Sequence, residues 1–431
     1  MTLIRNPQNP VMTNPATPGR RAIKPVVKPG GQALASQRKK GNTPALLRRL
    51  RAVVAGLMIV LGVSTVVLGN AAAAETDLKA SSGVQAIRMT TMSTHLLHAD
   101  QTAAEYLIAT ENQLAANQQK YLAELRTALE NTDELVFNAA ADPSTDRGWL
   151  VDINAMVSRY ERDLERAVSD RDLSYLNTAN KTLQDDILPR LEESTFAAIA
   201  QANSPRGYQF TIPGISWVAA LVLLALCVPV AKTSHRVLNV GLLTSAVAAL
   251  VIAVWSSVTL TIGPWDYQPI YNAGKARSVV ASAQLADLRA ARLGATGADY
   301  TDELKQWDEC VDQAQSLLYE DLLYEDDDVL QLLTVYTGNH AQLVKEMQQK
   351  NWDTVRSTLL TDEKDGALRS SVRSFDQAVL RIQNERLAEV RSVADANRNS
   401  LLVLSSLATL LTLGGLIGGI WGLNRRLKEY E

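Results

Sequence analysis

Four long stretches of the sequence contain no Asp, Glu, Lys, Arg or His. A membrane-spanning helix needs about 20 mainly apolar residues to cross about 30 Å of hydrocarbon, and each stretch has about that length. A single water-soluble domain would not need four such segments, so the chain is predicted to cross a membrane four times. The stretches are Ala52–Gly69, Ile215–Ala231, Val237–Ile262 and Leu401–Leu423.

Charged residues are sorted into blocks between these stretches. Residues 1–51 hold 11 Lys or Arg and no acid, residues 70–214 hold 12 basic and 21 acidic residues, and residues 263–400 hold 15 and 23. Lys and Arg concentrate on the cytoplasmic side of short segments that flank a membrane. Because the basic pieces are the N-terminal tail, Lys232–Arg236 and Arg425–Lys428, the pattern predicts a multi-pass protein of the cell membrane with both termini in the cytoplasm.

The predicted fold is an all-α membrane protein with four transmembrane helices and two extracytoplasmic domains that resemble four-helix bundles. Ala71–Ala74 would suit cleavage of a signal peptide, but the long preceding tail favours an uncleaved anchor. The predicted order is a disordered basic tail (1–50), a first span (51–70), a first bundle (71–214), a second span (215–231), a cytoplasmic hairpin (232–236), a third span (237–262), a second bundle (263–400), a fourth span (401–423) and a cytoplasmic tail (424–431).

The basic tail has three interpretations. Its arginines at Arg48–Arg51 could bind anionic membrane lipid, they could dock a soluble cytoplasmic partner, or they could serve only to set the topology. The sequence does not distinguish these roles.

Apolar residues in both outer blocks recur in steps of three and four, which is typical of helices packed in bundles. From Gly366 to Gly414 no Gly or Pro interrupts the chain, so one stiff helix is predicted to run from the second block into the fourth span. The predicted seam residues are Leu96, Ala99, Ala103 and Tyr106 in the first block, and Leu368, Val372, Phe375, Val379 and Ile382 in the second.

The two outer blocks also share a short sequence. Ala99-Asp100-x-x-Ala103-Ala104 recurs as Ala286-Asp287-x-x-Ala290-Ala291, and each block is flanked by two spans. The shared layout favours an internal duplication, in which each copy is one helical bundle.

Three further features bear on packing and on metal sites. Gly414, Gly415, Gly418 and Gly419 form two overlapping small-xxx-small patterns, which predict close helix packing either within the chain or with a second copy. His95 and His98 could share one helix face, but no third metal ligand is identifiable, so solvated or packed histidines are the preferred interpretation. Cys227 and Cys310 lie in different regions and are not expected to form a disulfide.

Motifs for catalysis are missing from the sequence. It has no P-loop, nucleophile elbow, HExxH or Gly-rich dinucleotide loop, and the spans carry none of the acids and bases that coupled transporters place at membrane depth. We therefore predict no catalytic residue, no cofactor, no metal and no nucleic-acid partner. Because the cytoplasmic segments are short, a separate protein is expected to carry any output.

One segment in each outer block carries a family resemblance. Leu97–Leu107 reads LHADQTAAEYL and Leu285–Leu293 reads LADLRAARL. With four spans and two bundles, the chain resembles the actinobacterial GlnX-type membrane proteins. The resemblance implies a receptor that works with an extracytoplasmic glutamine- or glutamate-type binding lipoprotein and a soluble Ser/Thr kinase. Amino-acid supply would then influence nitrogen and carbon metabolism through the kinase.

The predicted function is accordingly a signalling or adaptor protein that relays extracytoplasmic amino-acid status to a cytoplasmic kinase. One alternative is a chemoreceptor-like sensor that binds a small ligand directly in a helical bundle. Another is an envelope scaffold without a signal. The sequence leaves the ligand and its contact residues open.

Overall fold

A computed structural model describes residues 43–140, 147–205, 207–208, 210–234, 239–261, 266–321, 327–360 and 368–428. Most of the predicted N-terminal tail, part of the 232–236 hairpin and the last three residues lie outside these ranges. Residues 44–431 form one structural unit.

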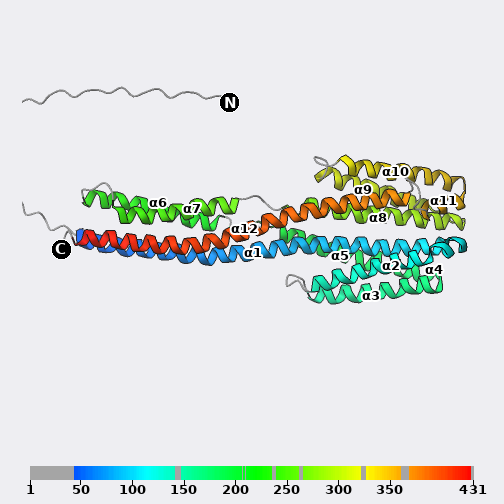
Figure 1. The fold of residues 1–431 in the computed structure, drawn as a ribbon, viewed down its shortest axis with the longest axis horizontal. Helices are drawn as coiled ribbons and strands as arrows, with labels where there is room; N and C mark the ends of the chain where they lie inside the picture. Colours follow the sequence, from blue (N-terminus) through cyan, green and yellow to red (C-terminus); the bar gives the residue numbers. More distant parts are fainter. Residues whose placement is uncertain are drawn as a thin grey trace, which may run out of the picture. The chain divides into compact units, whose positions relative to one another are not determined.

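Helices make up the regular structure of the described residues, and no strand occurs among them (Figure 1). A π-helical turn at Thr182–Ile187 joins α4 to α5. The helices are α1 (Thr43–Ile108), α2 (Glu111–Ala140), α3 (Arg147–Asp170), α4 (Leu173–Lys181), α5 (Leu188–Ala202), α6 (Thr211–Ser234), α7 (Val240–Thr261), α8 (Gln268–Ala295), α9 (Thr301–Asp321), α10 (Asp327–Gln348), α11 (Trp352–Leu360) and α12 (Leu368–Leu427).

Four of these helices, α1, α6, α7 and α12, are long and apolar enough to cross a membrane. The predicted class of an all-α membrane protein with four spans is therefore confirmed. Helices α6 and α7 have 24 and 22 residues, about the length of one membrane crossing. Helix α1 has 66 residues and α12 has 60, so these two helices continue far outside the bilayer. The apolar stretch of α1 passes without a break into the outer block through Ala71–Ala74, because alanine has the highest helix propensity of all residues.

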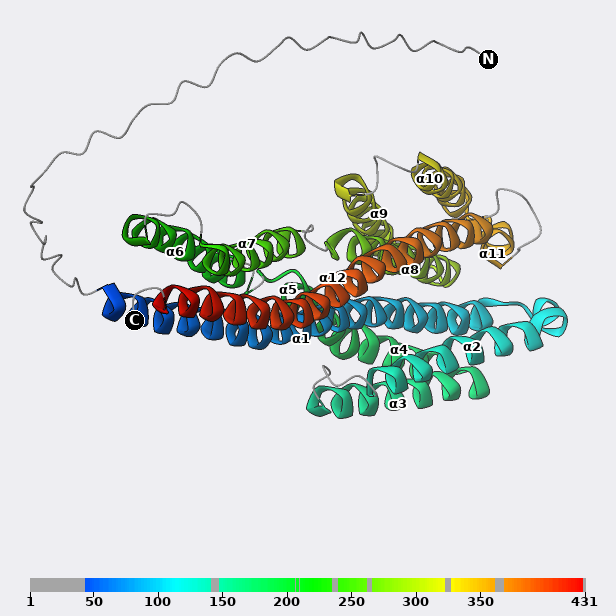
Figure 2. The same ribbon diagram turned by 60° about the vertical axis from the view of Figure 1, so that its left-hand side comes forward.

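At the membrane end, α1 and α12 lie side by side and α7 packs against them (Figures 1 and 2). Gly415 lies against Met58 of α1, and the Ser245 hydroxyl of α7 donates a 2.6 Å hydrogen bond to the Gly415 carbonyl. Gly418 contacts Thr244, whereas Gly414 has no neighbour within 4 Å of the position a Cβ would take among the described residues. Small residues thus let α7 and α12 approach closely within one chain.

Polar contacts join α1 to α12 at both ends of the membrane region. The Arg51 guanidinium donates to the Asn424 side-chain oxygen at 2.8 Å, near the first residues of α1 and the last residues of α12. Where the two helices enter the outer region, Arg398 and Asp77 form an ion pair of 2.9 Å. These two contacts therefore connect the long helices at both ends of the membrane region.

The outer end consists of two helical bundles. The outer part of α1 packs with α2, α3, α4 and α5, and α8 packs with α9, α10, α11 and the outer part of α12 (Figure 2). Buried residues from both bundles belong to one continuous apolar core, in which α1 and α8 meet. At that contact Gly274 of α8 lies against Thr90 of α1, so the two bundles share an interface.

The structure places all nine predicted seam residues in this core. Each side chain is at most 7% exposed. A buried Leu or Phe contributes roughly 2 kcal/mol through removal of its apolar surface from water. The seam side chains therefore hold α1 and α12 in place within their bundles.

Candidate functional site

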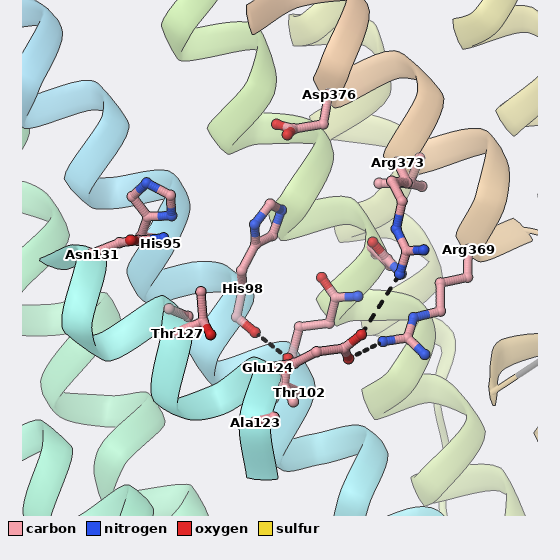
Figure 3. A pocket seen from close by; sticks show the side chains of 14 residues that line it. His95, His98, Thr102, Ala123, Glu124, Thr127, Asn131, Arg369, Arg373 and Asp376 are labelled. Carbon is pink, nitrogen blue, oxygen red and sulfur yellow. Dashed lines mark hydrogen bonds and ion pairs between the residues drawn. The ribbon is translucent and has the colours of Figure 1, made fainter. Parts of the chain in front are cut away.

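A cleft of about 400 Å³ lies between the two bundles (Figure 3). The first bundle contributes His95 and His98 from α1 and Glu124 from α2. The second contributes Gln284 from α8 together with Arg369, Arg373 and Asp376 from α12. Both long helices thus line the cleft.

The central contact of the cleft joins α2 to α12. The Glu124 carboxylate accepts a 2.6 Å hydrogen bond from the Arg369 guanidinium through Oε2, and its Oε1 lies 3.8 Å from Arg373. The two arginines are one helical turn apart, so both guanidinium groups reach the same carboxylate (Figure 3). A carboxylate is therefore held between two positive charges.

The two arginines differ in how firmly they are held. Arg369 has a side chain that is 7% exposed, and it also pairs at 3.2 Å with Glu105 of α1, which is fully buried. The Gln101 amide donates to Glu105 at 2.9 Å, and the Arg369 guanidinium lies 5.9 Å from the centre of the Tyr121 ring. Arg373, with a side chain 49% exposed, stands at the solvent side.

A second ion pair closes one end of the cleft. The Arg277 guanidinium binds Asp376 through two hydrogen bonds of 2.7 and 3.2 Å and donates a third, of 3.2 Å, to Gln383. Burial opposes ionisation of Asp376, but the Arg277 charge and hydrogen bonds outweigh it and lower the pKa of the carboxyl group. Asp376 is therefore ionised and already paired.

The two histidines are uncharged near neutral pH. Burial, assisted by the nearby His98 and Arg277, lowers the pKa of His95 to about 4. Burial also lowers the pKa of His98, against the opposing effect of Asp376. The imidazoles therefore offer hydrogen-bond donors and acceptors to the cleft instead of positive charge.

In the described part of the chain, no group of three or more His, Cys, Asp and Glu could hold a metal ion. His95 and His98 instead face the cleft (Figure 3). The arrangement of paired arginines, carboxylates and neutral imidazoles is suited to binding a small charged molecule.

The sequence analysis interpreted His95 and His98 as solvated or packed histidines and left the ligand-contact residues open, and it missed the charged side chains of α12. A signal was present, because Arg369, Arg373 and Asp376 each directly follow a predicted seam residue. Positions beside an apolar seam border the neighbouring helices of a bundle. Charged residues at three successive seam-flanking positions could have indicated a polar contact with another helix.

A second, smaller cleft of about 280 Å³ lies between the bundles and is lined by residues of α1, α5, α8 and α9. It contains one ion pair, in which Lys275 lies 2.6 Å from Glu192. The first cleft has the greater concentration of charge and includes α12, so we treat it as the candidate site.

These features define a multi-pass, all-α membrane protein with a charged cleft between the two helical bundles that lie beyond its apolar spans. Residues 74–205, from the outer part of α1 to the end of the first bundle, match a family model described as an actinobacterial sensor domain. No curated protein and no solved structure matches the chain. The family match indicates a role in sensing and signalling.

Proposed function

We propose that the chain is a transmembrane signalling protein, not an enzyme, and that α1 and α12 carry a signal from the outer cleft to the cytoplasmic side. The observation that supports this proposal most strongly is that both helices line the cleft and both continue through the membrane. A change in the cleft therefore acts directly on the two elements that reach the other side.

The lengths of the two helices support the same proposal. At 1.5 Å per residue, about 70 Å of helix separates His98 from Arg51. On α12, Arg373 lies about 78 Å from Arg425 by the same measure. Apart from Pro44 in the first turn of α1, no proline occurs in either helix, so no proline kink absorbs a displacement between the cleft and the inner ends.

Features of the sequence support the proposed partners and the proposed orientation. The basic flanking segments support an orientation with both termini in the cytoplasm. The likeness of Leu97–Leu107 and Leu285–Leu293 to GlnX-type proteins supports an extracytoplasmic binding lipoprotein as the source of the signal and a cytoplasmic Ser/Thr kinase as its receiver. Amino-acid status is then the quantity relayed.

A second candidate function is a sensor that binds a small ligand directly. The cleft favours it, because paired charges and neutral imidazoles surround a volume large enough for a small metabolite. In this function the binding lipoprotein is not required for the response.

Insertion of Gly-Gly-Pro after Asn397 tests the proposed function, because it breaks α12 between the cleft and the membrane. We expect the variant to enter the membrane normally and to lose the kinase response to extracellular amino acid. The same insertion after Pro143, between α2 and α3, is the control and should leave the response intact. An impermeant thiol reagent that labels a cysteine placed at the exposed Lys120 verifies the orientation in the same cells.

An unchanged response after insertion at Asn397 would show that α12 is only an anchor. Transmission would then have to pass through α1. Loss of the response in both variants would point to general damage to the outer domain.

A further inference from the structure

We infer that the cleft binds a small organic carboxylate, whose carboxylate group replaces that of Glu124 between Arg369 and Arg373. In the structure Glu124 occupies this place, with one oxygen 2.6 Å from Arg369 and the other 3.8 Å from Arg373. Two guanidinium groups directed at one carboxylate form a recognition site for that group. The side chain of Glu124 marks where the ligand binds.

The receiving arginine is fixed independently of Glu124. Glu105 and the Tyr121 ring hold the Arg369 guanidinium from the side of α1 and α2. Glu105 is itself fully buried and accepts a hydrogen bond from Gln101. Arg369 therefore keeps its position when Glu124 leaves, and a preorganised donor loses less entropy on binding a ligand.

Glu124 is the carboxylate that can leave. Its side chain is 31% exposed, whereas that of Glu105 is 0% exposed. A partly exposed carboxylate recovers its hydration when it swings into water, whereas a buried one would be left without compensation. An incoming carboxylate thus competes with Glu124 and not with Glu105.

The other titratable groups of the cleft do not compete for the ligand's carboxylate. Asp376 is already neutralised by Arg277, and both histidines are uncharged. Once Glu124 has left, the ligand's carboxylate takes its place beside the Arg369 and Arg373 guanidinium groups. His95, Thr127 and Asn131 line the far part of the cleft (Figure 3) and provide hydrogen bonds for polar groups on the rest of the ligand.

Binding would also change how the bundles are connected. Glu124 belongs to α2 of the first bundle, and its ion pairs tie that helix to α12 of the second. A ligand that replaces Glu124 removes the ion pairs between α2 and α12, while the contacts of Arg369 with Glu105 of α1 and with the Tyr121 ring remain. This last step rests on the proposed signalling function, but binding of the carboxylate does not.

Calorimetric titration of the purified full-length chain in detergent tests the inference. The probes are L-glutamine, L-alanine, L-lactate, succinate and inorganic sulfate. We expect at least one of the four organic carboxylates to bind and sulfate not to compete with it. Absence of binding by all four would overturn the inference, and so would equal competition by sulfate, because the site would then select charge alone.

Two substitutions with opposite expected effects make the test specific. Arg373→Gln should weaken carboxylate binding by about tenfold or more, because a charge-assisted hydrogen bond is lost. Glu124→Gln should strengthen binding by about tenfold, because the competing carboxylate is removed. If Glu124→Gln instead weakens binding, Glu124 contacts the ligand and the displacement model is wrong.

Arg381→Gln is the matched control for Arg373→Gln. It removes another α12 arginine whose side chain is 54% exposed and which pairs with Glu385 away from the cleft. The control should bind as the unmodified chain does. Equal weakening in both arginine variants would overturn the assignment of Arg373 to the site. Binding with the expected signs but without any kinase response would leave the site standing and count against the proposed signalling function.

Discussion

Each of the two outer bundles buries one aspartate at the same place in its repeated sequence, but the bundles treat it differently. Asp100 of α1 and Asp287 of α8 are both fully buried, as are the flanking alanines Ala99 and Ala286. A buried tyrosine from the third helix of each bundle lies nearby, Tyr160 in the first bundle and Tyr336 in the second. The common arrangement supports the duplication that the repeated sequence suggests.

In the second bundle the aspartate belongs to a complete hydrogen-bond network. His340 lies 2.8 Å from one oxygen of Asp287, and the Tyr336 hydroxyl donates to the other at 3.3 Å. Trp307 donates a 2.8 Å hydrogen bond to Tyr336 and stacks on His340 with the two ring centres 3.4 Å apart. Every member of this buried network has a polar partner.

The described residues of the first bundle form no corresponding network. Leu164 stands four residues after Tyr160, where the second bundle has His340 four residues after Tyr336. The Tyr160 hydroxyl donates to the backbone oxygen of Leu96, and neither oxygen of Asp100 has a hydrogen-bond partner among the described residues. Burial raises the pKa of Asp100 to about 7, against the opposing charges of Arg289 and Arg292.

The two buried carboxylates thus differ in their hydrogen bonding, because Asp287 has partners for both oxygens and Asp100 has none among the described residues. Burial raises the pKa of Asp287 as well, but hydrogen bonds from His340, Tyr336 and Trp307 oppose the rise. A buried polar group that is satisfied specifies a core, whereas an unsatisfied one retains its full desolvation penalty.

The largest expected change in stability comes from disrupting the hydrogen-bond network around Asp287. Asp287→Leu leaves His340 and Tyr336 buried without their acceptor, so we expect the free energy of unfolding to fall by about 4 kcal/mol. Thermal unfolding of the full-length chain in detergent measures the change. Asp100→Leu is the matched control and should not destabilise the protein. Equal losses in the two variants would contradict the contrast between the bundles.

Much of this fold could be predicted from the sequence, because its signals are local. The seam from Leu368 to Ile382 and the lack of Gly or Pro after Gly366 predicted the long helix α12, which the structure contains as one element. The same evidence was available for α1, since its helix-favouring alanines join the first span to the first bundle. The nine-residue helix α11 was missed, because it is too short to show a clear period.

The candidate site could not be predicted in the same way. Arg369 and Glu124 are 245 positions apart in the sequence. No local sequence pattern indicates which faces of two such distant helices pack together. Likewise the repeated segments around Asp100 and Asp287 look equivalent in sequence. Their difference depends on Leu164 and His340, residues of other helices that are brought together only by packing.

The second prediction concerns the pH dependence of stability. The pKa of Asp100 rises from an ordinary 3.8 to about 7 on folding, so between these values this carboxyl group binds a proton more readily in the folded protein than in the unfolded chain. The contribution of Asp100 to stability therefore falls as the pH rises from about 4 to about 7, and its full penalty is present above that range.

Asp100→Asn removes this penalty. Above the pKa of the folded state we expect a gain of roughly 2 kcal/mol in the free energy of unfolding, which is less than the full shift implies because the buried amide still lacks partners. Below about pH 4 the gain should vanish. Unfolding measured across this pH range tests the prediction, and a gain that does not depend on pH would exclude Asp100 as its source.

The smallest expected effect comes from rebuilding the second bundle's network in the first. Leu164→His places an imidazole one turn after Tyr160, as His340 stands one turn after Tyr336, and gives the Asp100 carboxylate a partner. A hydrogen bond to a charged group is worth about 2 kcal/mol, and the lost packing of Leu164 offsets part of it, so we expect a net gain of about 1 kcal/mol above pH 7.

The same substitution in the Asp100→Asn background provides the control, because that variant lacks the charge. Since the two residues are expected to touch, their effects should not add. If Leu164→His has the same effect in both backgrounds, the imidazole does not reach Asp100, and the correspondence between the bundles ends at the tyrosines.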